Sequence, residues 1–390
     1  MKINSPASAA PCPLALFHPA NNVPTVWGRT PTERASRQLK NLKIPITQEA
    51  PPSGTTALVV VRDDVIFHQS VLKGLKDHPG TALVDDLGRP LAAHLATSTP
   101  EALNDVRRWL DAGGVAPSDL RSASAADIAD LYNAALRRRD DPYALRVDAG
   151  NLAAIEKRIF LATYKGVTDL VTKYWWPLPA RFATKACVRL GLTPNLVTSV
   201  SGILAVAVCF QFAKGNYGLG LAMAWPMIFL DTVDGKLARV TLNSSKFGDV
   251  LDHGIDLIHP PVWYLTWGFG LAGSLGEHFV PLMWILFGAY AAGRLCEGVF
   301  ARRFGFHVHV WRPFDSAFRL ILARRNPNLI LLTLSWIAGH PAWGLWAITA
   351  WTLITLAVQL VQTVQSTLAA RRGRVRSWLE MPPAAPAPGP

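Results

Sequence analysis

Five carboxylates and a basic pair stand in one short stretch, "DTVDGKLARVTLNSSKFGDVLDHGID", which runs from Asp231 to Asp256. Apolar segments flank it on both sides, "LAMAWPMIFL" before it and "LIHPPVWYLTWGFGLAG" after it. A charged side chain at the centre of a bilayer costs about 2.5–3.5 kcal/mol on insertion scales, so charges at such a place indicate function. The sequence therefore requires something that neutralises these acids.

Four of the acids form two pairs with helical spacing. Asp231 and Asp234 are three residues apart, and Asp252 and Asp256 are four apart, so each pair shares one face of a helix. Two antiparallel helices joined by a short polar loop can bring both pairs together. Four anions in a site of low dielectric repel one another unless cations lie between them. Oxygen ligands favour Mg²⁺ or Mn²⁺, and no His or Cys stands at the spacing of a zinc site.

Small and basic residues accompany the acids. Gly235, Gly248 and Ala238 leave room for a ligand close to the backbone or for close helix packing. Lys236 and Arg239 add positive charge beside the predicted metals. Metal ions and basic side chains at a membrane edge are typical of a pyrophosphate site, as used in phosphoryl transfer.

The complete spacing is D-x-x-D-G-x-x-A-R-x8-G-x3-D-x3-D, and it resembles the signature of the CDP-alcohol phosphatidyltransferase family. The predicted six spans, an interfacial helix before them and "TPN" at the start of the first also resemble that family, so the resemblance covers residues 155–370. The fixed positions are Asp231, Asp234, Gly235, Ala238, Arg239, Gly248, Asp252 and Asp256.

The resemblance implies a homodimer with six spans per subunit and a polar cavity open to the cytoplasm. It implies two metal ions held by Asp231, Asp234 and Asp252, with Asp256 sharing one of them. It also makes Asp256 the base that acts on the acceptor hydroxyl, which attacks the β-phosphorus of the donor and releases CMP. The residues that it assigns to the CDP moiety are Asp231, Gly235, Ala238, Arg239 and Gly248.

The hydrophobic pattern predicts a multi-pass all-α membrane domain of six transmembrane helices over residues 196–370. The fifth candidate is short for a spanning helix of about 20 residues. Thirteen Lys or Arg residues follow the second, fourth and sixth spans, against Lys214 alone on the opposite side, which predicts cytoplasmic termini. The expected spans are 196–213, 217–239, 248–272, 279–301, 328–340 and 342–365.

Two segments border the predicted membrane domain. Residues 151–195 carry seven Lys or Arg against two acids, interleaved with aromatic and aliphatic residues. This pattern predicts helices that lie in the membrane interface, and its alternative is a soluble helical linker. Residues 371–390 form a basic, Pro/Ala-rich tail that we expect to be disordered.

Further charged residues lie in or near the spans. Arg294 and Glu297 are three residues apart within the fourth span, which predicts either an internal ion pair or a site for an acceptor phosphate. Lys236 is a second candidate for binding that phosphate. One or two of the arginines between Arg312 and Arg325 could also clamp an anionic acceptor.

Residues 1–145 are predicted to form a cytoplasmic α/β domain that resembles a nucleotidyltransferase. Strands are expected in "TTALVVVRDDVIF" and on both sides of the turn in "TALVDDLGRPLAAHLA". Helices are expected in "HQSVLKGLKDHPG", "TPEALNDVRRWLDAGG" and "SAADIADLYNAALRRRDDP".

This domain faintly resembles nucleotidyltransferase domains that make CDP-activated alcohols, which some relatives fuse to a phosphotransferase, as in synthases of di-inositol phosphate. Asp63 or Asp64 would then be the metal-binding residue at the end of a strand. The region "APCPLALFHPANNVPTVWGR" has no glycine-rich turn and no Lys to cradle a triphosphate. An inactive or regulatory domain is therefore the preferred interpretation.

Composition agrees with a membrane protein facing the cytoplasm. Half of the 390 residues are hydrophobic and 17% are charged, with a net charge of +12. The apolar runs favour an anionic membrane surface over nucleic acid as the partner of the excess charge. The four cysteines show no paired spacing, and the N-terminus lacks the apolar core of a signal peptide.

We interpret the chain as a phosphotransferase of the inner or plasma membrane. It would move a phospho-alcohol unit, most plausibly phosphatidyl from CDP-diacylglycerol, to a hydroxyl acceptor in phospholipid biosynthesis, using Mg²⁺ or Mn²⁺. One alternative is a bifunctional enzyme that uses a soluble CDP-alcohol such as CDP-inositol. A divalent-cation transporter is an alternative from another class, but it does not explain Gly235, Ala238 or Arg239.

Overall fold

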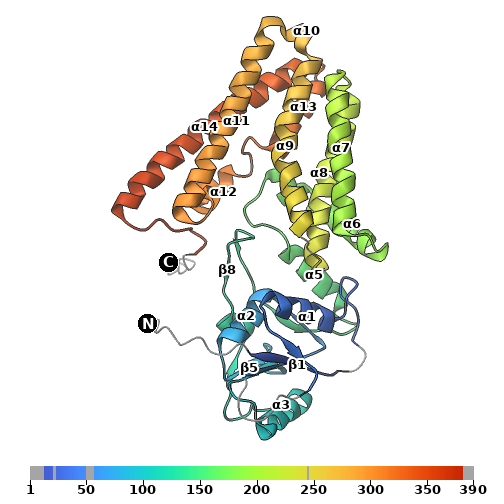
Figure 1. Ribbon diagram of the computed structural model, residues 1–390, viewed down its shortest axis with the longest axis vertical. Coiled ribbons are helices and arrows are strands. Elements are labelled where there is room, and N and C mark those ends of the chain that lie inside the picture. Colours follow the sequence, from blue (N-terminus) through green and yellow to red (C-terminus); the bar gives the residue numbers. More distant parts are fainter. Residues whose placement is uncertain (1–12, 21–22, 50–56, 244–245, 381–390) are drawn as a thin grey trace, which may run out of the picture. The chain divides into compact units, whose positions relative to one another are not determined.

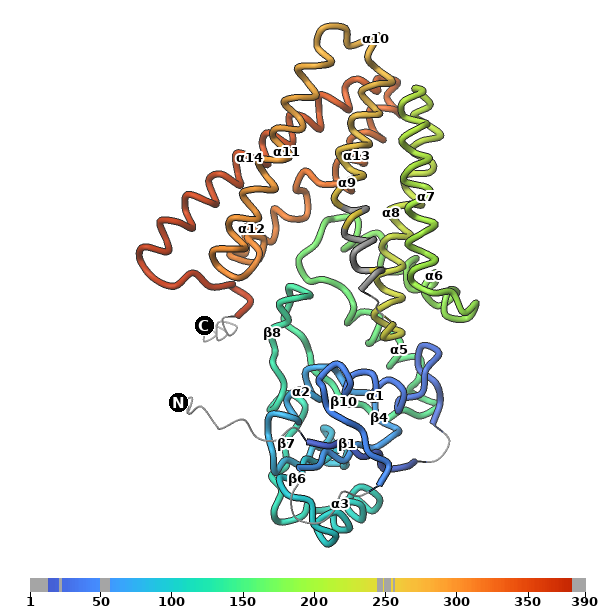
Figure 2. The backbone as a smooth tube through the Cα atoms, viewed as in Figure 1, coloured from blue at the N-terminus to red at the C-terminus, as the bar shows by residue number. Residues whose placement is uncertain are grey.

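The computed structural model describes residues 13–20, 23–49, 57–243 and 246–380. Side chains are not described at 246–247, 249–253 and 255–256. The chain forms two compact units, one of Met1–Asn133 with Asp140–Ala162 and the other of Ala134–Arg139 with Thr163–Pro390. Figures 1 and 2 show the elements of each unit.

A six-stranded mixed sheet forms the first unit, in the order β2-β1-β3-β6-β5-β7. β1 runs parallel to β2 and β3, whereas β6 is antiparallel to β3 and β5. β7 continues the sheet parallel to β5. The strands are β1 Leu14–His18, β2 Ile46–Thr47, β3 Leu58–Arg62, β5 Thr81–Val84, β6 Pro90–Leu95 and β7 Arg121–Ala123.

Helices cover both faces of this sheet (Figure 1). α1, Pro31–Asn41, and α2, Gln69–Asp77, pack on one face, and α3, Pro100–Ala112, packs on the other. The β-branched residues of β3 are fully buried between the two layers because both faces are covered. The α/β class predicted for this part of the chain is confirmed.

Most local elements of the first unit agree with the sequence. α3 begins where Thr99 caps it, its hydroxyl accepting from the N–H of Ala102 at 3.1 Å, and it ends at Gly113. The predicted hairpin is β5 and β6. The strand expected before the acidic turn at Asp63 and Asp64 is β3, which ends at Arg62. After the turn the chain forms β4, Val65–Phe67, which pairs with β10, Ala144–Arg146.

The prediction of a helix in "SAADIADLYNAALRRRDDP" is wrong. Only α4, Ala125–Ile128, forms, and residues 132–133 (β8) and 138–139 (β9) are extended. Ile128 is buried, and its carbonyl lies so close to Gly74 of α2 that a Cβ there would approach it to 2.0 Å. Tertiary packing against α2 therefore stops the helix after one turn.

α5, Leu152–Ala162, belongs to the first unit, which thus runs past residue 145. The indole N–H of Trp27 donates to the carbonyl of Glu156 at 3.0 Å. Its ring stacks on Phe160 with 5.8 Å between centroids. These buried contacts attach α5 to the loop before α1.

The second unit is helical, and helices occur at all six predicted spans. Three segments of its described residues are long and apolar enough to cross a membrane: Pro194–Ala213, Ala272–Phe304 and Pro341–Arg372. These apolar helices agree with the predicted membrane domain, while the count of six spans stays a prediction. The helices at the predicted spans are α7 Pro194–Ala213, α8 Tyr217–Val240, α9 Lys246–Gly270, α11 Phe279–Phe304, α13 Arg325–Ile337 and α14 Pro341–Arg372.

Shorter elements complete this unit. The interfacial segment forms a π-helical turn at Val171–Trp175 and α6 at Pro177–Arg189, with Trp175 and Phe182 exposed. Between the spans lie α10, Ala272–Leu275, and α12, Pro313–Phe318. An exposed apolar face next to basic residues is what the interfacial prediction requires, but lipid contact itself stays a prediction.

Close helix packing builds two groups in the second unit. α7, α8 and α9 pack together, and α11 runs beside α14 (Figure 2). In the first group, Phe212 lies against Gly220, where a Cβ would come within 2.4 Å of its ring. The indole of Trp263 donates to the carbonyl of Ala205 at 3.0 Å, which fixes α9 on α7. These contacts hold the helices that carry the acidic motif.

The contact between α2 and α4 yields a prediction for stability. Replacing Gly74 by Ala should lower the free energy of unfolding of the first unit by about 1–3 kcal/mol, because its Cβ would meet backbone atoms that cannot move aside. Hydrogen exchange of the β3 and β5 amides in the full-length protein measures this loss.

Lys73→Ala is the matched control at the preceding position. It removes an ion pair to Asp130 of 2.7 Å between two side chains that are more than half exposed, so the loss should stay below about 1 kcal/mol. Equal protection in the Gly74→Ala variant and the unaltered protein would contradict the packing argument.

Candidate functional site

The first acidic pair of the motif lies on one continuous face of α8. Asp231, Asp234, Gly235 and Ala238 follow at helical spacing, and the helix runs through them to Val240. Asp234 is only 3% exposed, and the hydroxyl of Thr198 donates to its Oδ2 at 2.6 Å. A buried carboxylate is thus held by a donor from the neighbouring helix.

Thr198 reaches Asp234 because of how α7 begins. The hydroxyl of Thr193 accepts from the N–H of Leu196 at 3.3 Å, and Pro194 occupies the first turn. This cap and proline fix the start of the helix. Thr198 then lies on the buried side of α7, at 5% exposure. The "TPN" segment therefore sets the position of the donor for Asp234.

Asp231 is held by a cation instead. Nη2 of Arg325, the first residue of α13, lies 2.6 Å from its Oδ2. Both side chains are largely buried, with 9% of Asp231 and 17% of Arg325 exposed. The carboxylate at the first motif position thus has a positive partner from a helix that begins 94 residues later.

The predicted CDP-binding residues on α8 include one position without a side chain. Among the described side chains, a Cβ on Gly235 would meet the guanidinium of Arg239, at 3.5 Å, which is ordinary contact. Arg239 itself is exposed at the end of the helix. The approach of a ligand to the backbone at Gly235 and the binding of CDP there stay predictions.

Lys236 has a different environment from its neighbours. Its ammonium donates to the carbonyl of Thr163 at 3.2 Å and lies 3.2 Å from the ring centroid of Tyr164. The side chain is 4% exposed. In this structure Lys236 fixes the segment after α5 to α8, and its predicted contact with an acceptor phosphate stays untested.

The second acidic pair falls on α9. Its backbone is helical from Lys246, so Gly248, Asp252 and Asp256 share the predicted face. The side chains of Asp252 and Asp256 lie outside the described residues. Among the side chains that are described, no group of three or more His, Cys, Asp or Glu could hold a metal ion. A four-carboxylate site thus stays a prediction.

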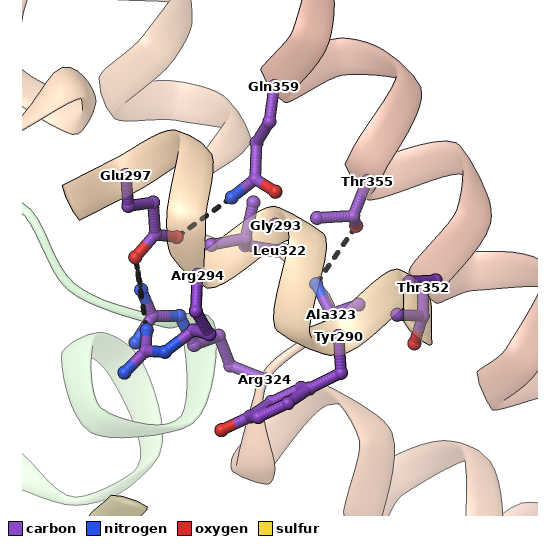
Figure 3. Close-up of a pocket in the computed structure, with 11 residues that line it drawn as sticks. Tyr290, Gly293, Arg294, Glu297, Leu322, Ala323, Arg324, Thr352, Thr355 and Gln359 are labelled. Atoms are coloured by element: carbon purple, nitrogen blue, oxygen red, sulfur yellow. Dashed lines mark hydrogen bonds and ion pairs between the residues drawn. The ribbon is translucent and has the colours of Figure 1, made fainter. Parts of the chain in front are cut away.

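Glu297 is the centre of a separate charged cluster between α11 and α14 (Figure 3). It accepts from Arg294 at 3.0 Å, from the amide of Gln359 at 2.8 Å and from Arg324, and His309 lies 3.4 Å from it. The internal ion pair predicted for Arg294 and Glu297 is confirmed. A cavity of about 20 Å³ beside them has room for roughly one water molecule.

The acidic turn of the first unit does not resemble an open metal site. Nε and Nη2 of Arg62 donate to the two oxygens of Asp64 at 2.8 and 2.7 Å, a bidentate pair. Burial raises the pKa of Asp63. The likeness of this unit to nucleotidyltransferases stays a prediction.

Residues 191–351 match the family model of the CDP-alcohol phosphatidyltransferases. The chain carries a domain of that family, so the resemblance predicted from the acidic motif is confirmed.

Three curated relatives each match a short part of this chain. Archaetidylinositol phosphate synthase of Pyrococcus horikoshii is 38% identical over 72 residues, which are 18% of this chain and 38% of that protein. Phosphatidylinositol phosphate synthase of Mycobacterium marinum is 30% identical over 91 residues, 22% of this chain and 39% of that protein. CDP-diacylglycerol–serine O-phosphatidyltransferase of Helicobacter pylori is 29% identical over 112 residues, 27% and 46% respectively. The chain thus spans less than half the length of these relatives.

A solved structure is also similar. The crystal structure of Mycobacterium tuberculosis phosphatidylinositol phosphate synthase with CDP-DAG bound is 20% identical, with a TM-score of 0.37, and covers 47% of this chain and 92% of that one.

Several partners of the acids were not predicted from the sequence. Thr198 and Arg325 hold the α8 pair, and Gln359 and His309 hold Glu297. Gln359 has one visible signal, since an amide within an apolar helix needs a polar partner. Its reach depends on Gly293, where a Cβ would lie 2.5 Å from its Oε1.

The Glu297 cluster yields a second prediction. Glu297→Gln should lower the free energy of unfolding of the second unit by about 3 kcal/mol, because Arg294 and Arg324 would lose their shared negative charge. Thermal unfolding in detergent measures the change. Arg294→Gln is the control, with a loss of about 1 kcal/mol, since a third of that side chain is exposed. Equal midpoints for Glu297→Gln and the unaltered protein would refute the assignment.

Proposed function

We propose that the second unit transfers a phospho-alcohol group, phosphatidyl in the favoured case, from a CDP-linked donor to a hydroxyl acceptor with release of CMP. The observation that carries this proposal is the acidic motif at full spacing within a matching family domain, with Asp231 and Asp234 on one buried face of α8. The name of the Helicobacter pylori relative supports CDP-diacylglycerol as donor.

Divalent metal fits the residues that are present. Asp231 and Asp234 supply oxygen ligands, and the space at Gly235 would admit a diphosphate beside them. Asp252 and Asp256 would complete a site for two ions, Mg²⁺ or Mn²⁺. Bound metal would neutralise the charge that develops on the diphosphate. Arg325 would have to release Asp231 when the site fills.

The reaction then needs few groups from the chain. Asp256 would take the proton of the acceptor hydroxyl, and that oxygen would attack the β-phosphorus of the donor. The bond from this phosphorus to the bridging oxygen breaks, and CMP leaves with that oxygen. Asp231, Gly235, Ala238, Arg239 and Gly248 would bind the CDP moiety and hold the diphosphate in line for the attack.

The acceptor is a hydroxyl compound, and two classes are supported. Two relatives are named as synthases of archaetidylinositol phosphate and phosphatidylinositol phosphate, and a third as a serine O-phosphatidyltransferase. Arg294 and Lys236 remain candidates for an acceptor phosphate. We further propose a homodimer, as the family resemblance implies. The predicted spans and the distribution of basic residues support a place in the inner or plasma membrane with both termini cytoplasmic.

A test of the activity measures CMP release by the purified protein in detergent. With CDP-diacylglycerol and Mn²⁺, release should depend on one acceptor among inositol phosphate, glycerol phosphate, serine and inositol. The Asp256→Asn variant should lose at least about 100-fold in rate, because it keeps the shape but not the base.

Release with CDP-inositol and not CDP-diacylglycerol would support the soluble-donor alternative instead. Transport of Mn²⁺ into vesicles without any CMP release would favour the cation transporter and refute the enzyme.

Thr198 provides a sharper test of the α8 pair. Thr198→Val removes the donor that holds Asp234, so the Mn²⁺ concentration for half-maximal activity should rise about tenfold. Thr198→Ser keeps the hydroxyl and should behave as the unaltered protein. A rise of the unfolding midpoint with Mn²⁺ gives a readout that does not depend on turnover, and an unchanged Mn²⁺ requirement in Thr198→Val would contradict this role.

A further inference from the structure

Six arginines lie where α11 and α14 end in the second unit, and we call them the α11–α14 arginine cluster. All six side chains are exposed, and none forms an ion pair among the described residues. No acid occurs in residues 298–314 or 341–379, so the segments that carry the cluster have no negative side chain of their own. The members of the cluster are Arg302, Arg303, Arg371, Arg372, Arg374 and Arg376.

Two hydrogen bonds bring the arginines after α11 and those after α14 together. Nη1 of Arg303 donates to the hydroxyl of Thr367, near the end of α14, at 3.2 Å. Beyond α14, the hydroxyl of Ser377 donates at 2.7 Å to the carbonyl of Val310, in the segment that follows α11. Both groups of arginines therefore lie at the same end of the second unit.

The basic segment after α14 is fixed on both sides. α14 continues to Arg372, and Ser377 is fully buried, with 0% of its surface exposed. The indole N–H of Trp378 donates to the hydroxyl of Ser316 at 3.0 Å. Because residues 373–376 are held between these anchors, their arginines lose less conformational entropy on binding a ligand than those of a free tail would.

The cluster lies just beyond an apolar surface. α14 has 32 residues and is apolar enough to cross a membrane. At 1.5 Å per residue it is about 48 Å long, whereas the hydrocarbon core of a bilayer is about 30 Å thick. In the predicted membrane domain its last turns therefore reach the lipid headgroups on the cytoplasmic side. Large apolar side chains stay exposed until shortly before the arginines begin, at Leu360, Val361, Val364 and Leu368.

Other arginines of this unit have acidic partners. Arg312, Arg324 and Arg325 count toward the predicted orientation, and in the folded unit they form ion pairs. The cluster has no such acid, so its like charges repel one another unless anions neutralise them. Orientation explains the number of arginines, but it does not require six of them to gather on a fixed segment.

We propose that the α11–α14 arginine cluster binds the headgroups of anionic phospholipids. Guanidinium groups form paired hydrogen bonds with phosphate oxygens, and a basic surface beside a membrane attracts anionic lipid. The exposed apolar side chains of α14 would contact the acyl chains of the same lipids. A lipid thus matches both parts of this surface, whereas a soluble anion matches the charges alone. The inference rests on the predicted membrane domain and not on the proposed transfer reaction.

A binding test counts the lipids that stay bound to the full-length protein. The protein would be incubated in detergent with equal amounts of phosphatidylglycerol and phosphatidylcholine and analysed by native mass spectrometry. Bound lipid should be enriched in phosphatidylglycerol by about fivefold or more, because ion pairing adds to apolar contact. A four-glutamine variant should lower this enrichment by at least about threefold. It combines Arg371→Gln, Arg372→Gln, Arg374→Gln and Arg376→Gln.

Two matched variants separate charge from structure. Lysine at the same four positions keeps the charge and should keep most of the enrichment. A second variant removes the same charge from exposed residues of the first unit and should leave the enrichment unchanged. It combines Lys40→Gln, Lys43→Gln, Arg108→Gln and Arg121→Gln. A four-glutamine variant of the cluster that prefers phosphatidylglycerol as strongly as the unaltered protein would overturn the proposal.

A second test places the protein in nanodiscs. Adding phosphatidylglycerol to a phosphatidylcholine bilayer should raise the unfolding midpoint by about 2–4 °C. High salt should remove most of this rise, because screening weakens contacts between exposed charges. In phosphatidylcholine alone, the four-glutamine variant should unfold no earlier than the unaltered protein, since it has lost only exposed like charges. An equal rise with phosphatidylglycerol in both proteins would refute the lipid site.

The last comparison distinguishes lipid from a soluble anion. Inorganic phosphate added to phosphatidylcholine nanodiscs should raise the midpoint no more than chloride of equal ionic strength. A rise equal to that with phosphatidylglycerol would show a general anion site and overturn the lipid assignment. CMP release enters neither test. Normal turnover without a preference for phosphatidylglycerol would refute the lipid site alone, and a preference without any turnover would refute only the proposed function.

Discussion

The second unit depends on the stabilisation of carboxylates in apolar surroundings. Asp234 is buried on α8, and an ionised acid there is tolerated only with a donor or cation beside it. Thr198 of α7 supplies the donor, and Arg325 of α13 supplies the cation for Asp231. These partners come from helices far apart in sequence, so keeping the acids charged fixes where α7 and α13 lie against α8.

Two further carboxylates of this unit, Asp315 and Glu297, are also held by arginines and by an amide. Asp315 accepts from Nε and Nη2 of Arg312, both at 3.0 Å, and from the amide of Gln362 at 2.9 Å. Glu297 likewise combines arginines with the amide of Gln359. In both cases α14 provides the amide, so two of its three glutamines join an apolar helix to polar centres. An uncharged donor adds a hydrogen bond without bringing another charge into the low dielectric.

Local features could be predicted from the sequence, whereas partners in space could not. The spacing of the acids on α8, the cap at Thr99 and the apolar helices each follow from residues within one element. The pair of Asp231 and Arg325 has no such signal, because its members are 94 residues apart. The helix expected after Ser124 fails for the same reason, since contact with Gly74 of α2 ends it after one turn.

The arginines after the fourth predicted span combine two roles that the sequence does not separate. The positive-inside rule counts Lys and Arg in the loops, and nearby acids contribute little to it. Arg312, Arg324 and Arg325 therefore count fully toward orientation as the chain inserts. In the folded unit these three pair with Asp315, Glu297 and Asp231. Arg319 differs from them, because its buried Nε and Nη1 have no hydrogen-bond partner among the described residues.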